Sequence, residues 1–456
     1  MSLHRCGKFP RPFRSIRRGL IAANLVLAMV GALSAQWAEG TESSSPPLPS
    51  GSYEGLLFQL MESHPSVAQY KMRQSAQEAR ATFKDFVYPD PEVKVTTGKS
   101  DQTQAGYPTT YQNKRSQSYE VQVTQPIPFP GKLTAEANVQ EYRANEARYM
   151  YQLGLNRSIA RMLALISSYH RANASLRLTQ ELAGAAGALE GIARARYGAG
   201  TGSLSDVSLA RVQADTYREK VAMFKGDRDA AMDQLRYFAD EEGRLQKFLE
   251  ESSFRKYLSS VADRTYTLEE LPVVQRIKAV QDQSESADTL ARLQYLPDMG
   301  VFASYGKENM DLLYPVGSGK QTTYKFGVQL KIPLWSGLSN HKNVEAADKE
   351  RKATSLQQLD VKNEIQARIA SLSQKIEEGR NRLAIFQNRL VPNAWTARRS
   401  SVLAYQGGSA DFTSVIQAWN AYYEVNIQKL ALQEQLDQWI IERCEMTATF
   451  IRGNKQ

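Results

Sequence analysis

Cysteine and histidine are scarce in this chain. Its 456 residues include two cysteines, Cys6 and Cys444, and four histidines. Cys6 lies in an N-terminal segment that we expect to be removed, so Cys444 has no cysteine with which to form an intrachain disulfide. His64, His170 and His341 stand more than 100 residues apart, and such spacing does not predict a metal-binding or catalytic cluster. No metal site is expected.

Long hydrophobic runs and the common catalytic motifs are missing as well. After the N-terminus no run of about 18 apolar residues occurs, which excludes a transmembrane helix. The chain has no phosphate-binding loop, no dinucleotide-binding turn and no nucleophile elbow. We therefore predict that it is not an enzyme and needs no cofactor. Its 42% hydrophobic residues are enough for a core, while a mean hydropathy of −0.47 is too polar for a helical membrane protein.

Residues 1–40 have the three parts of a secretory signal peptide. Six Lys and Arg precede an apolar stretch from Leu20 to Leu33, and small residues follow it. Cleavage can fall near Ala35 or near Gly40. With one Glu, this segment has a net charge of +5, so removing it from the chain's +9 leaves +4. That charge is too small to indicate a nucleic-acid partner, and we expect residues 41–51 to form a flexible leader.

Three sequence patterns occur twice, about 207 residues apart and in the same order. Tyr88-Pro89-Asp90 recurs as Tyr295-Leu296-Pro297-Asp298. The segment 121–126 recurs as 328–333, and the segment 197–207 aligns without a gap with 405–415. Repeats in the same order predict a duplicated unit.

Each unit reads as helix, strand, strand, very long helix, glycine turn and helix. The first repeat spans 52–238 and the second 268–450, with a linker or equatorial region at 239–267 and a tail at 451–456. Alternating apolar and polar residues predict one hairpin in each repeat. Its strands lie at 92–97 and 118–123 across a loop at 101–113, and at 299–307 and 324–332 across a loop at 308–321.

The helices that follow the hairpins are predicted to be very long. No proline occurs from Lys132 to Tyr197, which at 1.5 Å per residue corresponds to roughly 100 Å of helix. In both long helices, apolar residues recur at alternating steps of four and three, which is the spacing of a coiled coil. Pro392 is expected to bend the second long helix about four turns before its glycine turn.

Two hairpins supply too few strands to close a membrane barrel. The smallest such barrels use about eight strands, and an open edge in lipid leaves backbone groups unpaired. The helices are too long to fold back over so small a sheet. Pooling strands with other copies is the remaining solution, and three copies of a four-stranded chain give twelve strands. Tyrosines near the predicted strand ends are also typical of a membrane interface.

With these features the chain resembles the TolC-type outer-membrane efflux proteins. The Tyr-x-x-Gly turns at 197–200 and 405–408, each with a Val seven residues after the Gly, look like the periplasmic tips of that family. The strand-to-helix junction from Gln125 to Lys132 is similar too, and slightly favours the heavy-metal-type branch. The resemblance covers residues 53–450.

The resemblance implies a mostly α fold with a small β part. Each chain would provide part of a long coiled-coil α-hairpin barrel and four strands of a trimeric 12-stranded outer-membrane β-barrel, with an internal two-fold sequence repeat. It implies a homotrimer in contact with outer-membrane lipids and with a periplasmic helical extension. Its partners would be a periplasmic adaptor protein and an inner-membrane pump. The implied function is the passive exit duct of a tripartite efflux or secretion system.

The two glycine turns contain the candidate docking residues. Ser203 has Asp206 three residues on, the spacing of a capping box, and its repeat equivalent Asp411 is also a good N-cap. Both residues can therefore be simple helix starts. The alternative is that the two turns expose backbone and side chains to an adaptor hairpin, through Gly198, Gly200, Gly202, Ser203, Leu204, Val207, Gly407, Gly408, Asp411, Phe412 and Val415.

The resemblance also implies a gate. In the family, an acidic residue at the position of Asp206 and a tyrosine at that of Tyr405 link neighbouring coils and hold the periplasmic end closed. A second link needs an arginine where this chain has Ala410. Asp411 is a candidate for a threefold acidic ring in the same region.

Three other interpretations stay open. The first is a structural or adhesive coiled-coil protein of the periplasm or cell surface without a pore. The second is a periplasmic adaptor, which the absence of a run of short strands disfavours. The third is an exported enzyme, which the missing site residues disfavour. Neither the substrate nor a role for Cys444 follows from the sequence.

Overall fold

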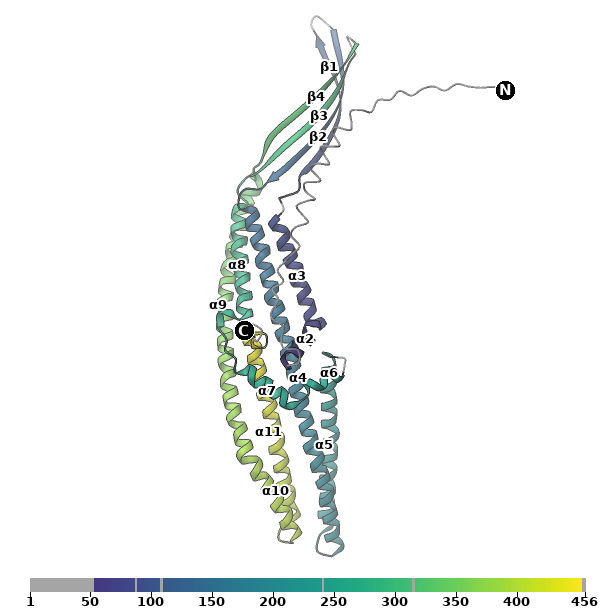
Figure 1. Ribbon diagram of the computed structural model, residues 1–456, viewed down its shortest axis with the longest axis vertical. Coiled ribbons are helices and arrows are strands. Elements are labelled where there is room, and N and C mark those ends of the chain that lie inside the picture. The colour runs from purple at the N-terminus through teal and green to yellow at the C-terminus, as the bar shows by residue number, and fades with distance from the viewer. Residues whose placement is uncertain (1–52, 87, 107–109, 240–241, 314–315, 453–456) are drawn as a thin grey trace, which may run out of the picture. The chain divides into compact units, whose positions relative to one another are not determined.

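The computed structural model describes residues 53–86, 88–106, 110–239, 242–313 and 316–452, which belong to one compact unit spanning 48–454. The predicted signal peptide (1–40) and leader (41–51) lie outside the described residues, as do residues 453–456 of the predicted tail. The described helices and strands follow the twice-repeated order that the sequence predicts (Figure 1).

The first repeat begins with two helices where the sequence predicts a single one. They meet at His64, because Pro65 begins the second helix and its missing N–H cannot continue the first. The elements of this repeat are α2 (Tyr53–Ser63), α3 (Pro65–Phe86), β1 (Glu92–Gly106), β2 (Thr110–Ile127), α4 (Lys132–Gly198) and α5 (Leu204–Arg236).

The second repeat has the same order of elements. It consists of α8 (Pro272–Leu293), β3 (Asp298–Leu313), β4 (Val316–Lys331), α9 (Leu334–Ile385), the π-helical turn η2 (Phe386–Leu390), α10 (Val391–Gln406) and α11 (Phe412–Thr447). The segment between the repeats forms α6 (Glu242–Phe248), α7 (Glu251–Ala262) and the short 3₁₀ turn η1 (Leu268–Glu270). The chain continues after α11 with α12 (Thr449–Arg452).

The four strands form one antiparallel sheet in the order β1-β2-β3-β4. Pairing runs from Glu92 with Thr124 to Gly106 with Thr110 in the first hairpin, and continues almost to the turn in the second. The predicted loops at 101–113 and 308–321 are therefore wrong, because most of their residues are strand. Ladder hydrogen bonds join backbone groups, so polar segments pair as well as apolar ones.

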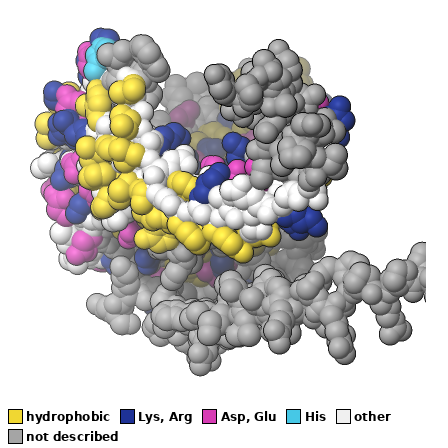
Figure 2. All heavy atoms as spheres, turned by 90° about the horizontal axis from the view of Figure 1, so that it is seen from above, with side chains coloured by type: hydrophobic (Ala, Val, Ile, Leu, Met, Phe, Trp, Pro, Cys, Tyr) yellow, Lys and Arg dark blue, Asp and Glu magenta, His cyan; other side chains and the backbone are white. Residues whose placement is uncertain are grey.

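The sheet has one apolar face and one polar face. Across it, Val95, Val121, Tyr305 and Tyr324 form one row, and all four are exposed by 41–67%. The neighbouring row, on the opposite face, is Lys94, Gln122, Ser304 and Lys325. Seen from above, hydrophobic side chains form a continuous band, with polar and basic side chains along its inner edge (Figure 2). A water-exposed sheet would not present such a face.

An ion pair joins the two repeats where the sheet meets the helices. The Lys132 Nζ atom lies 2.7 Å from Asp298 Oδ1 and also donates to the Leu296 carbonyl. The same Asp298 oxygen accepts the backbone N–H of Phe129 at 3.0 Å. Gly131, just before α4, has φ 94°, a conformation that favours glycine. The start of α4 is thus held to the start of β3.

Four helices lie side by side below the sheet in the order α3, α4, α8, α9 (Figure 1). Gly154 brings α3 close to α4, because an added Cβ there would lie 2.5 Å from the Tyr70 ring. Further along the chain, α4 packs against α5, α10 against α11, and α11 against α4. The predicted coiled-coil spacing is confirmed by burial, since Leu155, Ile159 and Met162 are at most 5% exposed.

A change of helix type occurs where Pro392 is expected to disturb the second long helix. The π-helical turn η2 ends immediately before α10, in which Pro392 is the second residue. A proline within a helix leaves one carbonyl without its donor, and a wider turn accommodates that loss. The helix thus changes type at the predicted place, about four turns before the glycine turn, and the bend itself stays a prediction.

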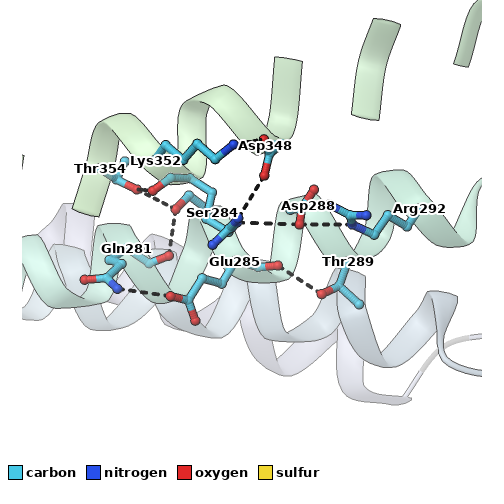
Figure 3. Close-up of polar contacts among 10 residues, drawn as sticks. Gln281, Ser284, Glu285, Asp288, Thr289, Arg292, Asp348, Lys352 and Thr354 are labelled. Carbon is cyan, nitrogen blue, oxygen red and sulfur yellow. Dashed lines mark hydrogen bonds and ion pairs between the residues drawn. The ribbon is translucent and has the colours of Figure 1, made fainter. Parts of the chain in front are cut away.

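Polar side chains lie buried between α8 and α9 (Figure 3). The Ser284 and Thr354 hydroxyls are 2.7 Å apart. The Asp288 carboxylate accepts from Arg292 at 3.1 Å and lies 3.7 Å from Arg351 of α9. These contacts hold the two helices in one register, because a shift would leave the buried groups unpaired.

The segment between the repeats packs against the middle of the long helices. Phe254 and Leu258 of α7 are buried in the same cluster as Leu163 of α4 and Ile440 of α11. Arg264, just after α7, makes a two-pronged ion pair with Glu54 of α2 at 2.9 and 3.0 Å. The described part of this segment from Glu242 onward thus forms short helices that pack against both repeats.

Asp437 of α11 is a buried carboxylate at this junction. It is 7% exposed, accepts from Ser167 Oγ at 3.1 Å and lies 3.8 Å from Arg255 Nη1. Burial raises the pKa of Asp437 to about 6, although Arg255 and Ser167 oppose the rise. Arg255 also pairs with Glu251 at 2.9 Å.

We predict that Asp437→Asn stabilises the protein at pH 8 and has little effect at pH 4. With a pKa of about 6 in the folded chain and about 4 when unfolded, the native state binds more protons between these values, so Asp437 makes stability fall as pH rises through them. Asn removes that loss, worth roughly 1–3 kcal/mol. Thermal unfolding followed by circular dichroism at both pH values measures it.

Asp215→Asn is the matched control for this prediction. Asp215 lies on α5, is exposed and pairs with Arg218 at 2.6 Å, so its replacement should change stability by less than about 1 kcal/mol at either pH. An Asp437→Asn protein that is no more stable than the wild type at pH 8 would contradict the prediction.

Candidate functional site

The two glycine turns have the same backbone design. After α4, the N–H of Thr201 donates to the Arg196 carbonyl at 2.9 Å, and after α10 the N–H of Ser409 donates to the Ala404 carbonyl at 2.9 Å. The left-handed residue that allows this closure is Gly200 in the first turn (φ 73°) and Gly408 in the second (φ 77°). Such a helix end favours glycine because a Cβ is strained there.

The remaining glycines of the turns have other roles. A Cβ at Gly202 would lie 3.0 Å from the Cβ of Arg196, so a larger residue fits only if the chain there shifts slightly. Gly198 has open space around it, and Gly407 has a negative φ. Both are exposed. The turns therefore present backbone at their outer surface, as an adaptor-binding hypothesis requires.

The helix starts after the two turns are capped differently. Ser203 is the N-cap of α5, and its hydroxyl oxygen accepts the Asp206 N–H at 3.1 Å. The same hydroxyl donates to Asp206 Oδ1 at 2.8 Å. Asp411 occupies the N-cap position of α11, but its carboxylate makes no capping hydrogen bond. Asp411 is exposed. Its backbone carbonyl, and not its carboxylate, accepts a hydrogen bond at this helix start, from the Ser414 N–H at 3.1 Å.

The structure brings the two predicted gate residues together. The Tyr405 hydroxyl donates to Asp206 Oδ2 at 3.2 Å, across 199 positions of sequence. Tyr405 is 2% exposed, and its ring meets that of Phe412 edge-on at 5.2 Å. Burial raises the pKa of the Tyr405 phenol, and the Asp206 carboxylate raises it further. The phenol therefore stays protonated and remains a donor at neutral pH.

Arg196 is a third member of this site, and the sequence analysis does not single it out. Its guanidinium donates to the Tyr405 carbonyl and to the Thr201 carbonyl, the latter at 3.1 Å. It also lies over the Tyr405 ring, 4.6 Å from the centroid. Arg196 thus supplies a guanidinium at this link, although Ala410 leaves the family's arginine position empty. The sequence feature that could have indicated Arg196 is its position directly before Tyr197, at the start of the first glycine turn.

The predicted docking residues divide into an exposed group and a buried group. Leu204 is 61% exposed, and Val207 is half-buried. Phe412 and Val415 are at most 2% exposed and belong to a core with Tyr405 and Trp419. A partner at this surface would therefore meet the glycine turns and Leu204, while Phe412 and Val415 support them from behind.

A ladder of aromatic and cationic side chains joins the two helix pairs behind the turns. Tyr217 of α5 packs against Trp419 and Tyr423 of α11. The Lys220 ammonium of α5 lies 3.9 Å from the Tyr423 ring of α11, whereas Arg398 of α10 lies 4.9 Å from the Trp419 ring within the α10–α11 pair. Cation–π contacts of this kind are worth about 0.5–2 kcal/mol each. The Tyr405 link is thus the outermost of several contacts between the pairs.

No group of His, Cys, Asp and Glu that could hold a metal ion occurs among the described residues. His64 bonds the Tyr237 carbonyl at 2.9 Å and Ser66 at 2.7 Å. His170 is buried against Phe254, and burial lowers its pKa. Within the same described ranges, each helix is too short or too polar to cross a membrane.

A comparison with protein families gives one match. The family model described as "Outer membrane efflux protein" matches residues 56–239 and 266–441, that is, both repeats. The segment between the two matches includes α6 and α7. A search of the curated proteins gives no match.

Solved structures of outer-membrane channels have the same fold. The channel OprN is 12% identical over 87% of this chain and 89% of its own, with a TM-score of 0.70. CusC is 12% identical over 86% and 91%, also with a TM-score of 0.70. VceC from Vibrio cholerae is 14% identical over 87% and 95%, with a TM-score of 0.66. These values show a shared fold, and the family match extends over most of the sequence. The chain belongs to the outer membrane efflux protein family.

Proposed function

We propose that this protein is the exit duct of a tripartite efflux or secretion system in the outer membrane. Three copies would pool their strands in a twelve-stranded barrel, and their helices would continue it as a periplasmic tunnel. A periplasmic adaptor would dock at the glycine turns, and an inner-membrane pump would supply substrate and energy. The heavy-metal-type branch and the cleavage of residues 1–40 belong to the same proposal.

The sheet carries this proposal. Its apolar face is exposed, with Phe326 at 80% and Val328 at 71%, and such a face suits contact with lipid. Within the described residues, β1 pairs with β2 and β4 pairs with β3, so each outer strand has one open edge. Open edges cannot remain in lipid. Joining β4 of one copy to β1 of the next satisfies both requirements.

The polar face suits a water-filled interior. Ser304 and Lys325 both donate to Glu120 Oε1, at 2.8 and 3.0 Å. These contacts bridge β2, β3 and β4 on the side away from the apolar row. A coiled-coil protein without a pore would have no use for a sheet with one lipid-compatible face, which argues against the structural or adhesive alternative.

The link between Tyr405 and Asp206 is proposed as the gate. It joins the end of α10 to the beginning of α5, the two places where movement of one helix pair against the other would widen the tunnel. Arg196 adds contacts between the same two turns. An adaptor that binds the exposed glycine turns would compete with these contacts and favour the open arrangement.

Lysine on the apolar face should prevent assembly in the outer membrane. Val328→Lys places a charge against lipid, which costs roughly 2–4 kcal/mol at the midplane. Gln329→Lys is the matched control, because it adds the same charge one residue further on the opposite face. We expect immunoblots of membrane fractions to show strongly reduced Val328→Lys and normal Gln329→Lys. Equal amounts of both in the outer membrane would contradict the proposed orientation of the sheet.

Loss of the Tyr405 link should open the channel. Tyr405→Phe with Asp206→Ala removes a hydrogen bond to a charged acceptor, worth roughly 1–3 kcal/mol, while the ring can still pack against Phe412. A change of this size raises the ratio of open to closed channels by roughly 5- to 150-fold. Single-channel recordings in planar bilayers should therefore show higher conductance or more frequent opening than the wild type.

Tyr197→Phe is the control for the gate. Tyr197 is the repeat equivalent of Tyr405 but is 49% exposed, so its hydroxyl should not affect conductance. Unchanged conductance in the double variant would count against the gate while leaving the channel itself in place. No conductance from any of the proteins would count against the duct.

A further inference from the structure

An open trough of about 450 Å³ lies along α4, between α3 and α8. Both flanking helices pack against α4, one on each side (Figure 1). Its lining combines cationic, acidic and apolar side chains: Arg73, Arg80, Arg143, Glu146, Tyr70 and Met150. The volume is within the range of small-molecule sites, about 300–1,000 Å³. The trough is far in sequence from the glycine turns and takes no part in the gate.

The trough has an excess of positive charge. Three arginines face one carboxylate there, and within the described part of the chain none of these four residues makes an ion pair. The guanidinium of Arg73 lies 5.8 Å from the centre of the Tyr70 ring. Elsewhere on the same helices arginines are paired: Arg171 lies 2.6 Å from Glu434, and Arg292 lies 3.1 Å from Asp288. Unpaired guanidinium groups retain their capacity to bind an anion from solution.

The apolar part of the lining is fixed in place. The Tyr70 ring lies directly over Gly154 of α4, where even a methyl group would collide with it. The Met150 sulfur accepts from Arg276 of α8 at 3.3 Å. An aromatic ring and a thioether make a surface that a flat apolar body can cover. The trough therefore offers cationic groups and an apolar floor within one site.

From this arrangement we propose that the trough binds organic anions with a flat apolar body, such as aromatic sulfonates or carboxylates. The three arginines hold the anionic groups, and the ring of Tyr70 with Met150 contacts the apolar body. The arginines are exposed, so binding is weak, salt-dependent and rapidly reversible. These properties suit a molecule in passage. The binding of the anion does not depend on the proposed function. Only the further statement that the anion is exported rests on that function.

The lining comes from three helices. Tyr70, Arg73 and Arg80 belong to α3, Arg143 and Met150 to α4, and Gln283 to α8.

Binding can be measured with pyrene-1,3,6,8-tetrasulfonate as the probe. Its four charges keep it out of neutral detergent micelles, and its fluorescence anisotropy rises when the full chain, purified in maltoside detergent, binds it. We expect binding by the wild type that weakens with added salt. The triple variant Arg73→Gln, Arg80→Gln, Arg143→Gln should bind at least about tenfold more weakly.

A matched triple variant controls for overall charge. Lys71→Gln, Arg148→Gln and Lys278→Gln remove the same charge from exposed positions on α3, α4 and α8 that are outside the trough lining. Its affinity should stay within about twofold of the wild type. Equal losses in both triple variants, or equal binding by the wild type and the trough variant, would overturn the proposal.

A variant that binds the probe more tightly tests whether misfolding explains the loss of binding, because a misfolded protein would not gain affinity. Glu146→Gln removes the carboxylate that opposes the anion, so the probe should bind a few times more tightly. Absence of tighter binding would count against the site. The same probe added to planar bilayers separates the two proposals. Binding in detergent without any channel activity would contradict the duct and leave the site standing, whereas conducting channels that do not bind the probe would contradict the site.

Discussion

The structure depends on one constraint: every backbone N–H and C=O group inside a lipid bilayer must have a hydrogen-bond partner. Four paired strands satisfy it inside the sheet but leave one open edge on β1 and one on β4. The exposed apolar row from Val95 to Tyr324 makes water an unsuitable environment for this sheet. One chain can satisfy neither requirement by itself. Association of several copies, edge to edge, satisfies both, as the proposed function requires.

The helices transmit this arrangement to the far end of the molecule. The ion pair of Lys132 Nζ with Asp298 Oδ1, at 2.7 Å, joins the beginning of α4 in the first repeat to the beginning of β3 in the second. The buried pair Ser284 and Thr354 fixes the register of α8 against α9. At the glycine turns Ser203 is exposed and Asp206 is half-buried. A partner bound to these turns would therefore lie next to the proposed gate at Tyr405.

Much of this fold could be predicted from the sequence, because periodicity reports burial directly. The duplication, both hairpins, the length of α4 and the coiled-coil spacing around Ile159 are present as predicted. The strand lengths were not predictable, because the polar residues from Asp101 onward do not alternate with apolar ones. They pair through backbone hydrogen bonds, which any side chain allows. Tyr405 and Asp206 were found through the family resemblance. Arg196 and the cationic trough were not, because their partners lie on other helices and only folding brings them together.

The most direct test of the central claim is the number of chains in the assembled particle. Native mass spectrometry of the mature protein, released from detergent in the gas phase, measures that number without a functional assay. The account predicts three chains per particle and a protein that precipitates when detergent is removed. A single chain that remains monodisperse in water without detergent would show that the apolar face and the open strand edges need no partner, and would contradict the account.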